Sequence, residues 1–126
     1  MIDRIDGILL SSKNSKKLSD FYKNVIGLRV EDEFEMEDGT RAYSMNLPDG
    51  PNLFISSHSD IKGNNNEPAR FIINFEVGDI EKEVERIGSE AKKIKDTYHV
   101  EGYGFIVTFE DPDGNYFQLV QVRPTN

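Results

Sequence analysis

The sequence predicts an α+β protein made of two copies of one β-α-β-β-β module. The tripeptide Pro-Asp-Gly occurs at residues 48–50 and again at residues 112–114, and each copy precedes an apolar segment typical of a strand. The apolar segment at residues 5–12 also has a counterpart at residues 70–77, which begins 65 positions later. Repetition at a nearly constant spacing indicates an internal duplication, so the two halves are expected to fold alike.

The first module is predicted to begin with a strand at residues 5–12, followed by a helix. Asn14 or Ser15 can cap this helix, and Gly27 ends it. Between them apolar residues recur every three or four positions, which is the spacing of a helix face that packs on a sheet. These residues are Leu18, Phe21, Tyr22, Val25 and Ile26. Three strands joined by tight turns complete the module.

The second module repeats this plan with a shorter helix. Residues 70–77 supply its first strand, and its helix begins at Asp79 and ends at Gly88. Its final strand follows the second Pro-Asp-Gly. The glycine and asparagine residues between the two modules are typical of a linker. We therefore expect a single domain at residues 1–126, with module one at 2–58, a linker at 59–68 and module two at 69–122.

The composition indicates a folded protein and excludes several classes of function. The net charge of −8 disfavours nucleic acid, because phosphates bind basic surfaces. The chain has no cysteine, so disulfides and zinc–cysteine sites are excluded. No apolar run reaches the roughly 20 residues of a membrane span, and the first residues lack the features of a secretion signal. The sequence thus predicts a cytoplasmic protein with no membrane or nucleic-acid partner.

Two motifs give the chain a resemblance to a known family. The segment LSDFYKNVIGLRV follows the first predicted strand, and FEDPDGNYFQLVQ ends the second module. With the duplicated module they resemble the vicinal oxygen chelate superfamily, which includes glyoxalase I, extradiol dioxygenases, methylmalonyl-CoA epimerase and the bleomycin and fosfomycin resistance proteins. The resemblance covers residues 2–122. It implies the glyoxalase/bleomycin resistance fold, in which two sheets curl into a partly open mixed β-barrel, but it does not identify the member.

The resemblance also implies where a metal would bind. Metal-using relatives place one ligand on the first and the last strand of each module, and the repeat assigns these positions to Gly7, Phe54, Ile72 and Gln118. Only Gln118 carries a donor atom, whereas divalent cations need several oxygen or nitrogen ligands. The sequence therefore predicts no metal and no other cofactor, and it disfavours a metal-dependent lyase or dioxygenase.

Alternation along the strands places polar side chains on the same face as these four positions. His58, Arg70, Asn74 and Glu76 are among them. His58 is interpreted either as an acid, base or ligand, or as a solvated residue at the rim, and the second interpretation is favoured. Arg70 and Glu76 either bind polar ends of a ligand or pair with charges across the sheet.

The loop at residues 97–105 contains Tyr98 and Tyr103 beside two glycines. It either forms a lid that stacks on a planar ligand, or it closes a hairpin and fills core space. Tyr43 and Met45 face either the cavity or the opposite side of the sheet, and alternation alone does not decide between them. The predicted ligand-binding residues are Phe54, His58, Arg70, Ile72, Asn74, Tyr98, Tyr103 and Gln118.

The predicted function is metal-independent binding or sequestration of a small organic ligand, cationic or aromatic, in the barrel cavity. A homodimer is expected, and the cavity forms either within one chain or across the dimer. The alternative is an enzyme of the glyoxalase, epimerase or dioxygenase type, using an atypical metal site such as His58, Glu76 and Gln118, or no metal. A third hypothesis is an interaction module whose cavity is filled by Phe54. The sequence identifies neither the ligand nor a resistance or metabolic role.

Overall fold

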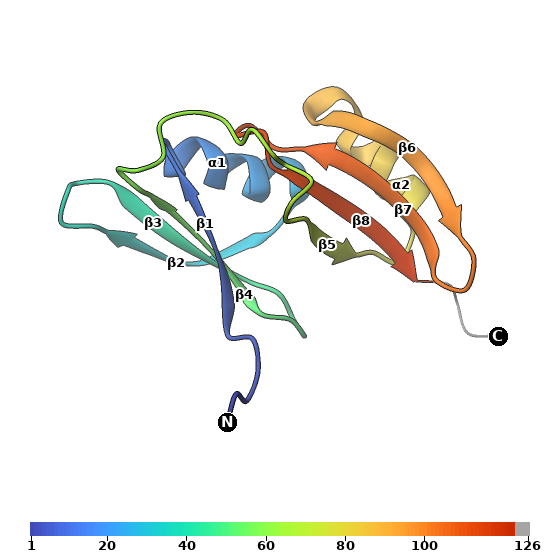
Figure 1. Ribbon diagram of the computed structural model, residues 1–126, viewed down its shortest axis with the longest axis horizontal. Coiled ribbons are helices and arrows are strands. Elements are labelled where there is room, and N and C mark those ends of the chain that lie inside the picture. The colour runs from blue at the N-terminus through green and yellow to red at the C-terminus, as the bar shows by residue number, and fades with distance from the viewer. Residues whose placement is uncertain (123–126) are drawn as a thin grey trace. The chain divides into compact units, whose positions relative to one another are not determined.

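The computed structural model describes residues 1–122 and contains two β-α-β-β-β modules (Figure 1). The chain divides into two compact units, at residues 1–63 and from residue 64 onward, and this division falls within the segment predicted as a linker. The first unit contains β1 (Gly7–Ser12), α1 (Ser15–Phe21), the π-helical turn η1 (Tyr22–Ile26), β2 (Arg29–Glu35), β3 (Arg41–Asn46) and β4 (Asn52–Ser57). The second contains β5 (Ile73–Glu76), α2 (Ile80–Ile87), the 3-10 turn η2 (Gly88–Glu90), β6 (Lys92–Val100), β7 (Gly104–Glu110) and β8 (Tyr116–Val122).

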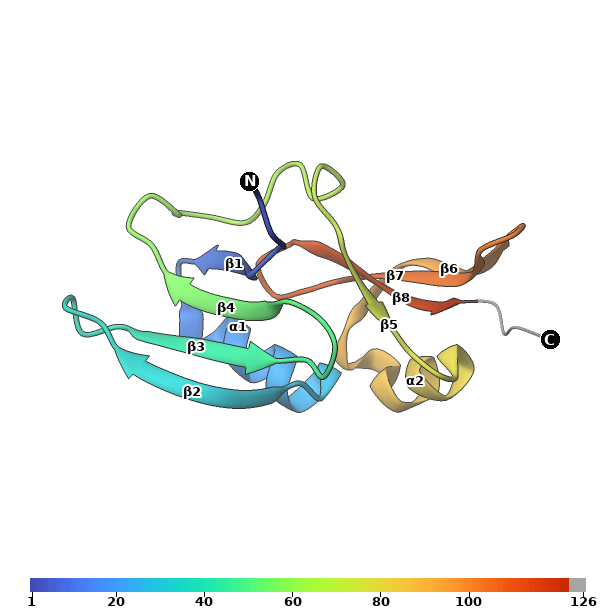
Figure 2. The same cartoon turned by 90° about the horizontal axis from the view of Figure 1, so that it is seen from below.

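Each unit forms one mixed four-stranded sheet, and the two sheets have the same topology. Their strand orders are β1-β4-β3-β2 and β5-β8-β7-β6. In each sheet the first and last strands of the module run parallel, and the remaining pairs are antiparallel. Figure 2 shows β4, β3 and β2 of the first sheet side by side. The predicted α+β fold of duplicated modules is therefore confirmed.

The core of the first unit lies between α1 and one face of its sheet. Asn14 caps the helix by accepting a hydrogen bond from the backbone N–H of Lys17 at 3.1 Å. Gly27 ends η1 with a φ of 93°, a left-handed conformation that favours glycine. Tyr43 and Met45 are buried and alternate with residues of the opposite face, so they point to the helix side rather than to a ligand.

The core of the second unit lies between α2 and its own sheet. Asp79 caps α2 by accepting a hydrogen bond from Lys82 N at 3.2 Å. Phe117 packs at the centre, with ring centroids 6.1 Å from Phe75 and 5.7 Å from Phe109. Within residues 1–122, no helix is long and apolar enough to cross a membrane.

The first strand of the second unit is shorter than predicted. A strand was expected at residues 70–77, but β5 begins at Ile73, which pairs with Phe117 near the start of β8. The residues before Ile73 have almost no partner on β8, because β8 begins at Tyr116 and the chain before it forms the turn at residues 112–114. Arg70 instead lies in a turn and donates its backbone N–H to Glu67 O. Alternation along a strand at residues 70–77 would place Phe71 on the helix-covered face, but Phe71 precedes β5 and is 59% exposed.

The turn before β8 is held by the side chain of Asp111. Its Oδ1 accepts hydrogen bonds from Asp113 N at 2.9 Å and Asn115 N at 3.0 Å, and its Oδ2 accepts one from Asn115 Nδ2 at 3.0 Å. Gly114 has a φ of 82°. Asn65 of the linker donates its backbone N–H to Asp113 O at 2.8 Å, so the linker is attached to this turn.

Candidate ligand-binding faces

The first candidate site is the face of the β1–β4 sheet that points away from α1. It includes two of the positions that the resemblance assigns to metal ligands, Gly7 and Phe54. The ring of Phe54 lies over Gly7: a Cβ atom built on Gly7 would clash with Phe54 Cε2 and would lie 2.9 Å from Phe54 Cδ2. A side chain at residue 7 would therefore require the Phe54 ring to move.

The surroundings of Phe54 are apolar or only weakly polar. Leu9 is its register partner on β1 and is 61% exposed. On the other side its partner is Ser44 of β3, which is buried. Phe54 itself is only partly buried. This face of the first unit therefore presents an aromatic ring and aliphatic groups to whatever contacts it.

The second candidate site is the face of the β5–β8 sheet that points away from α2. Gln118 lies at its centre, between Asn74 of β5 and Thr108 of β7 in the strand register. Gln118 Nε2 donates a hydrogen bond to Thr108 Oγ1 at 3.0 Å. The two faces correspond, because Leu9 pairs with Phe54 in one sheet as Asn74 pairs with Gln118 in the other. The open face of the second unit is therefore more polar than the open face of the first.

Ile72 and Arg70 precede β5 and do not belong to the paired strand. Arg70 is exposed and forms an ion pair with Glu67 at 2.7 Å. An exposed ion pair of this kind contributes little to stability, so Arg70 keeps the freedom to change partners. The prediction that Arg70 lies on the strand is wrong, although pairing with a neighbouring charge was one of its two interpretations. Ile72 is partly buried.

His58 lies just after β4 and is used within a local turn. Its Nδ1 accepts a hydrogen bond from Asp60 N at 3.0 Å, and its backbone N–H donates to Ser12 O at 3.0 Å. The side chain is half exposed, with the Asp60 carboxylate 3.8 Å away. This geometry supports the interpretation as a solvated residue at the strand end, because one ring nitrogen is already occupied by the backbone.

The two tyrosines of the predicted lid differ in their surroundings. Tyr98 lies on β6, where Lys95 Nζ is 4.1 Å from the centre of its ring. Tyr103 lies in the turn that joins β6 to β7, and its backbone N–H donates to Val100 O at 3.0 Å. Tyr103 is therefore part of the hairpin closure. Tyr98 shares its sheet face with Ile106, its register partner, and so with Thr108 and Gln118.

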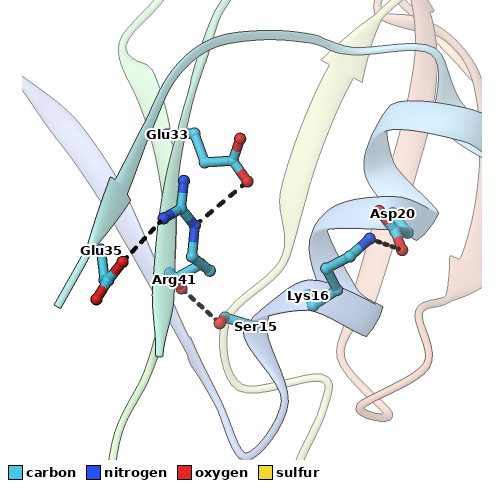
Figure 3. Close-up of polar contacts among 6 residues, drawn as sticks. All are labelled: Ser15, Lys16, Asp20, Glu33, Glu35 and Arg41. Carbon is cyan, nitrogen blue, oxygen red and sulfur yellow. Dashed lines mark hydrogen bonds and ion pairs between the residues drawn. The ribbon is translucent and has the colours of Figure 1, made fainter. Parts of the chain in front are cut away.

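The sequence interpretation missed a group of charged side chains on the α1 side of the first sheet (Figure 3). Arg41 lies 3.4 Å from Glu33 and 3.6 Å from Glu35, so the acidic strand is partly neutralised rather than only solvated. Lys16 and Asp20 form a second ion pair at 2.8 Å, and this pairing raises the pKa of Lys16. The sequence feature that could have indicated this group is Arg41, which follows a run of acidic residues at positions 31–38.

The hydroxyl of Tyr43 lies close to this charged group. It is buried and has no hydrogen-bond partner within residues 1–122. Burial raises the pKa of the Tyr43 phenol, and the negative charge of Glu33 adds to the shift. Because Tyr43 points to the helix side, this group is separate from the face that carries Phe54.

The residues at the four family positions do not fit a metal ion. Phe54 and Ile72 have no donor atoms, and the space at Gly7 is filled by the ring of Phe54. Gln118 offers a single amide oxygen, while its Nε2 donates to Thr108 Oγ1. Within residues 1–122, no three histidine, aspartate or glutamate side chains come together in a way that could hold a metal ion. A divalent cation requires more donors than these positions supply.

The two modules have the same strand order, and in each the first and last strands pair in parallel. Each module has one helix-covered and one open sheet face. This arrangement defines a class of duplicated α+β proteins. The family model described as the Glyoxalase/Bleomycin resistance protein/Dioxygenase superfamily matches residues 4–119. The chain therefore belongs to this superfamily. A comparison with curated proteins finds no match.

Solved structures with the same fold have different properties. TnmS3, an antibiotic-binding protein from a Streptomyces species, is 17% identical, with a TM-score of 0.72 and coverage of 97% of this chain and 98% of that chain. The fosfomycin resistance protein FosX from Listeria monocytogenes, as a variant in complex with Mn(II) and 1S,2S-dihydroxypropylphosphonic acid, is 21% identical, with a TM-score of 0.75 and coverage of 98% and 93%. A glyoxalase I variant from Zea mays is 16% identical, with a TM-score of 0.76 and coverage of 96% and 46%.

Proposed function

We propose that this chain is a metal-independent, cytoplasmic binding protein that holds a small organic molecule against the open sheet face of the first unit, which carries Phe54. The observation that carries the proposal is the position of the Phe54 ring over Gly7. An aromatic ring occupies the place where metal-using relatives have a ligand, so contact with an organic guest replaces coordination.

The open face of each unit offers its own kind of contact to a small molecule. Burying an aromatic or aliphatic side chain such as Phe54 or Leu9 contributes about 1.5–3 kcal/mol. The amide of Gln118 and the side chain of Asn74 supply hydrogen bonds that fix the orientation of a polar group. The similarity to the antibiotic-binding protein TnmS3 supports small-molecule binding. The FosX structure, which contains Mn(II), is an example of the same fold with a bound metal.

Fluorescence titration with 8-anilinonaphthalene-1-sulfonate tests the apolar face. We expect Phe54→Glu to weaken binding of this dye at least about tenfold, because the carboxylate replaces the aromatic contact. Met36→Glu is the matched control, since Met36 is an exposed apolar residue of the same unit outside the sheet. Circular dichroism establishes that both variants are folded. Equal dye affinity for Phe54→Glu and the unmodified protein would contradict the proposal.

Elemental analysis distinguishes this proposal from the enzyme alternative. Protein purified without added metal is expected to contain much less than one metal ion per chain. Stoichiometric metal, or metal-dependent turnover that is lost in His58→Ala, would favour a glyoxalase-, epimerase- or dioxygenase-like enzyme instead. The engagement of His58 Nδ1 by Asp60 N speaks for the binding protein.

We also propose that the protein is a homodimer. Ile2, Ile5 and Leu9 expose apolar side chains at or before β1, which is an edge strand of its sheet. Such a cluster at an open edge supports contact with a second copy. Light scattering at micromolar concentration is expected to give twice the mass of the 14.4 kDa chain. A monomer at that concentration would contradict the dimer and would leave the dye-binding test unaffected.

A further inference from the structure

A cavity of about 510 Å³ lies at the start of α2, on the helix-covered side of the second sheet. Residues from α2, β6, β7 and β8 line it. Phe105 of this cavity alternates with Ile106 and Thr108 along β7, so it projects from the face opposite to Gln118. The volume is within the range of small-molecule sites, roughly 300–1,000 Å³. Tyr98 of the edge strand β6 also lines the cavity, whereas Phe54 and Gln118 do not, so the cavity is distinct from the sites around those two residues.

The cavity contains an exposed aromatic platform. Phe105 is 37% exposed, and its ring centroid lies 5.0 Å from that of His99 at a tilt of 56°. Ile80, which is buried, adds an apolar surface at the start of the helix. Exposed aromatic rings attract apolar groups and, through their electron-rich faces, cations.

The ionisable side chains that line the cavity include two carboxylates. Asp79 and Glu81 line the cavity, and no lysine or arginine does so within residues 1–122. The helix start offers few free N–H groups, since Ile80 N donates to Gln121 Oε1 at 2.9 Å and Lys82 N donates to Asp79 Oδ1 at 3.2 Å. An anion would meet two carboxylates and occupied donors, so the usual attraction of a helix N-terminus for anions does not apply here.

We propose that this cavity binds an organic cation with an apolar or aromatic body, such as a substituted ammonium compound. The cation lies near Asp79 and Glu81, and the apolar body contacts Phe105 and His99. The site is open to solvent, so binding is weak and salt-dependent. The inference is independent of the proposed function, because neither Phe54 nor Gln118 lines this cavity.

NMR titration of the full-length ¹⁵N-labelled protein with benzyltrimethylammonium chloride tests the site. We expect amide shifts at Glu81, His99, Phe105 and Gln121 and little change at Gln118. Benzyl alcohol, a neutral compound with a similar ring, is expected to bind more weakly, and benzoate more weakly still. Shifts that are absent from the cavity, or that are as large for benzoate as for the cation, would overturn the proposal.

Variants distinguish binding in this cavity from non-specific attraction of the cation to the negatively charged protein. Phe105→Ala is expected to weaken binding of the cation about fivefold, and Glu81→Gln to weaken it by a smaller factor. Glu85→Gln removes the same charge from an exposed position of α2 outside the cavity and is expected to leave binding unchanged. Equal weakening by Glu81→Gln and Glu85→Gln would show non-specific attraction and overturn the site. Glu81→Gln keeps the test valid if Phe105→Ala does not fold.

Discussion

The two Pro-Asp-Gly turns have the same three residues, yet their structures differ. In the second turn Asp111 is 4% exposed and accepts three hydrogen bonds from the residues that follow it. The first turn has Leu47 at the equivalent position, and its Asp49 is exposed. Gly114 adopts a positive φ, whereas Gly50 does not. The comparison teaches that the flanking residues, rather than the shared tripeptide, decide how firmly each turn is held.

The largest expected difference between the turns concerns Asp111. Asp111→Ala leaves the buried N–H of Asp113 and the partly buried N–H of Asn115 without their acceptor, which is expected to lower the free energy of unfolding by about 3 kcal/mol. Asp49→Ala in the first turn is expected to change it by less than about 0.5 kcal/mol. Urea denaturation monitored by circular dichroism measures both. Equal effects would mean that the two turns are equally held.

The glycines of the two turns are expected to respond with opposite sign. Gly114→Ala is expected to destabilise the protein by about 1–2 kcal/mol, because alanine is strained at positive φ. The added Cβ would also lie 3.4 Å from Asn64 Cβ. Gly50→Ala meets only Leu47 Cβ at 3.8 Å, so it is expected to stabilise by about 0.4–1 kcal/mol through the unfolded chain. The same urea titration decides, and destabilisation by Gly50→Ala would contradict the comparison.

A smaller effect is expected at corresponding positions of the two cores. Tyr43 pairs with Ile55 as Val107 pairs with Leu119, so only the first unit buries a hydroxyl at this place. Tyr43→Phe removes a hydroxyl without a partner and is expected to stabilise the protein by about 1 kcal/mol at neutral pH. Unchanged or lower stability of this variant would indicate that the hydroxyl is satisfied.

The pH dependence of the same variant provides a second measurement. The folded-state pKa of Tyr43 is raised, so the folded protein holds the phenol proton more tightly than the unfolded chain does. This contribution is fully present below the unfolded pKa of about 10 and is lost as pH rises through the folded pKa. Urea titrations between neutral and alkaline pH should show a steeper loss for the unmodified protein than for Tyr43→Phe. Identical slopes would exclude this contribution.

Most of the fold could be predicted from the sequence because duplication and helix spacing are local signals. The caps at Asn14 and Asp79 and the helix ends at Gly27 and Gly88 were predicted and are observed. Alternation around Phe54 also places Leu53 and Ile55 on the opposite, helix-covered face, and both are buried. These features depend on neighbours within a few positions of one another.

The candidate site was less predictable because it depends on pairing between distant segments. Alternation extended the first strand of module two to Arg70, but pairing with β8 begins only at Ile73. The side of the sheet that Tyr43 faces also required the register with β4. The lean of the Phe54 ring over Gly7 is a matter of side-chain geometry, which no pattern of residue types encodes.

The contact between Phe54 and Gly7 has a consequence for substitutions at these two positions. A histidine introduced at residue 7 alone would collide with the ring, and a glutamate at residue 54 alone would have no coordinating companion. The two positions therefore depend on each other: a side chain at residue 7 needs space that the ring at residue 54 now occupies, so substitutions at the two positions are expected to have non-additive effects.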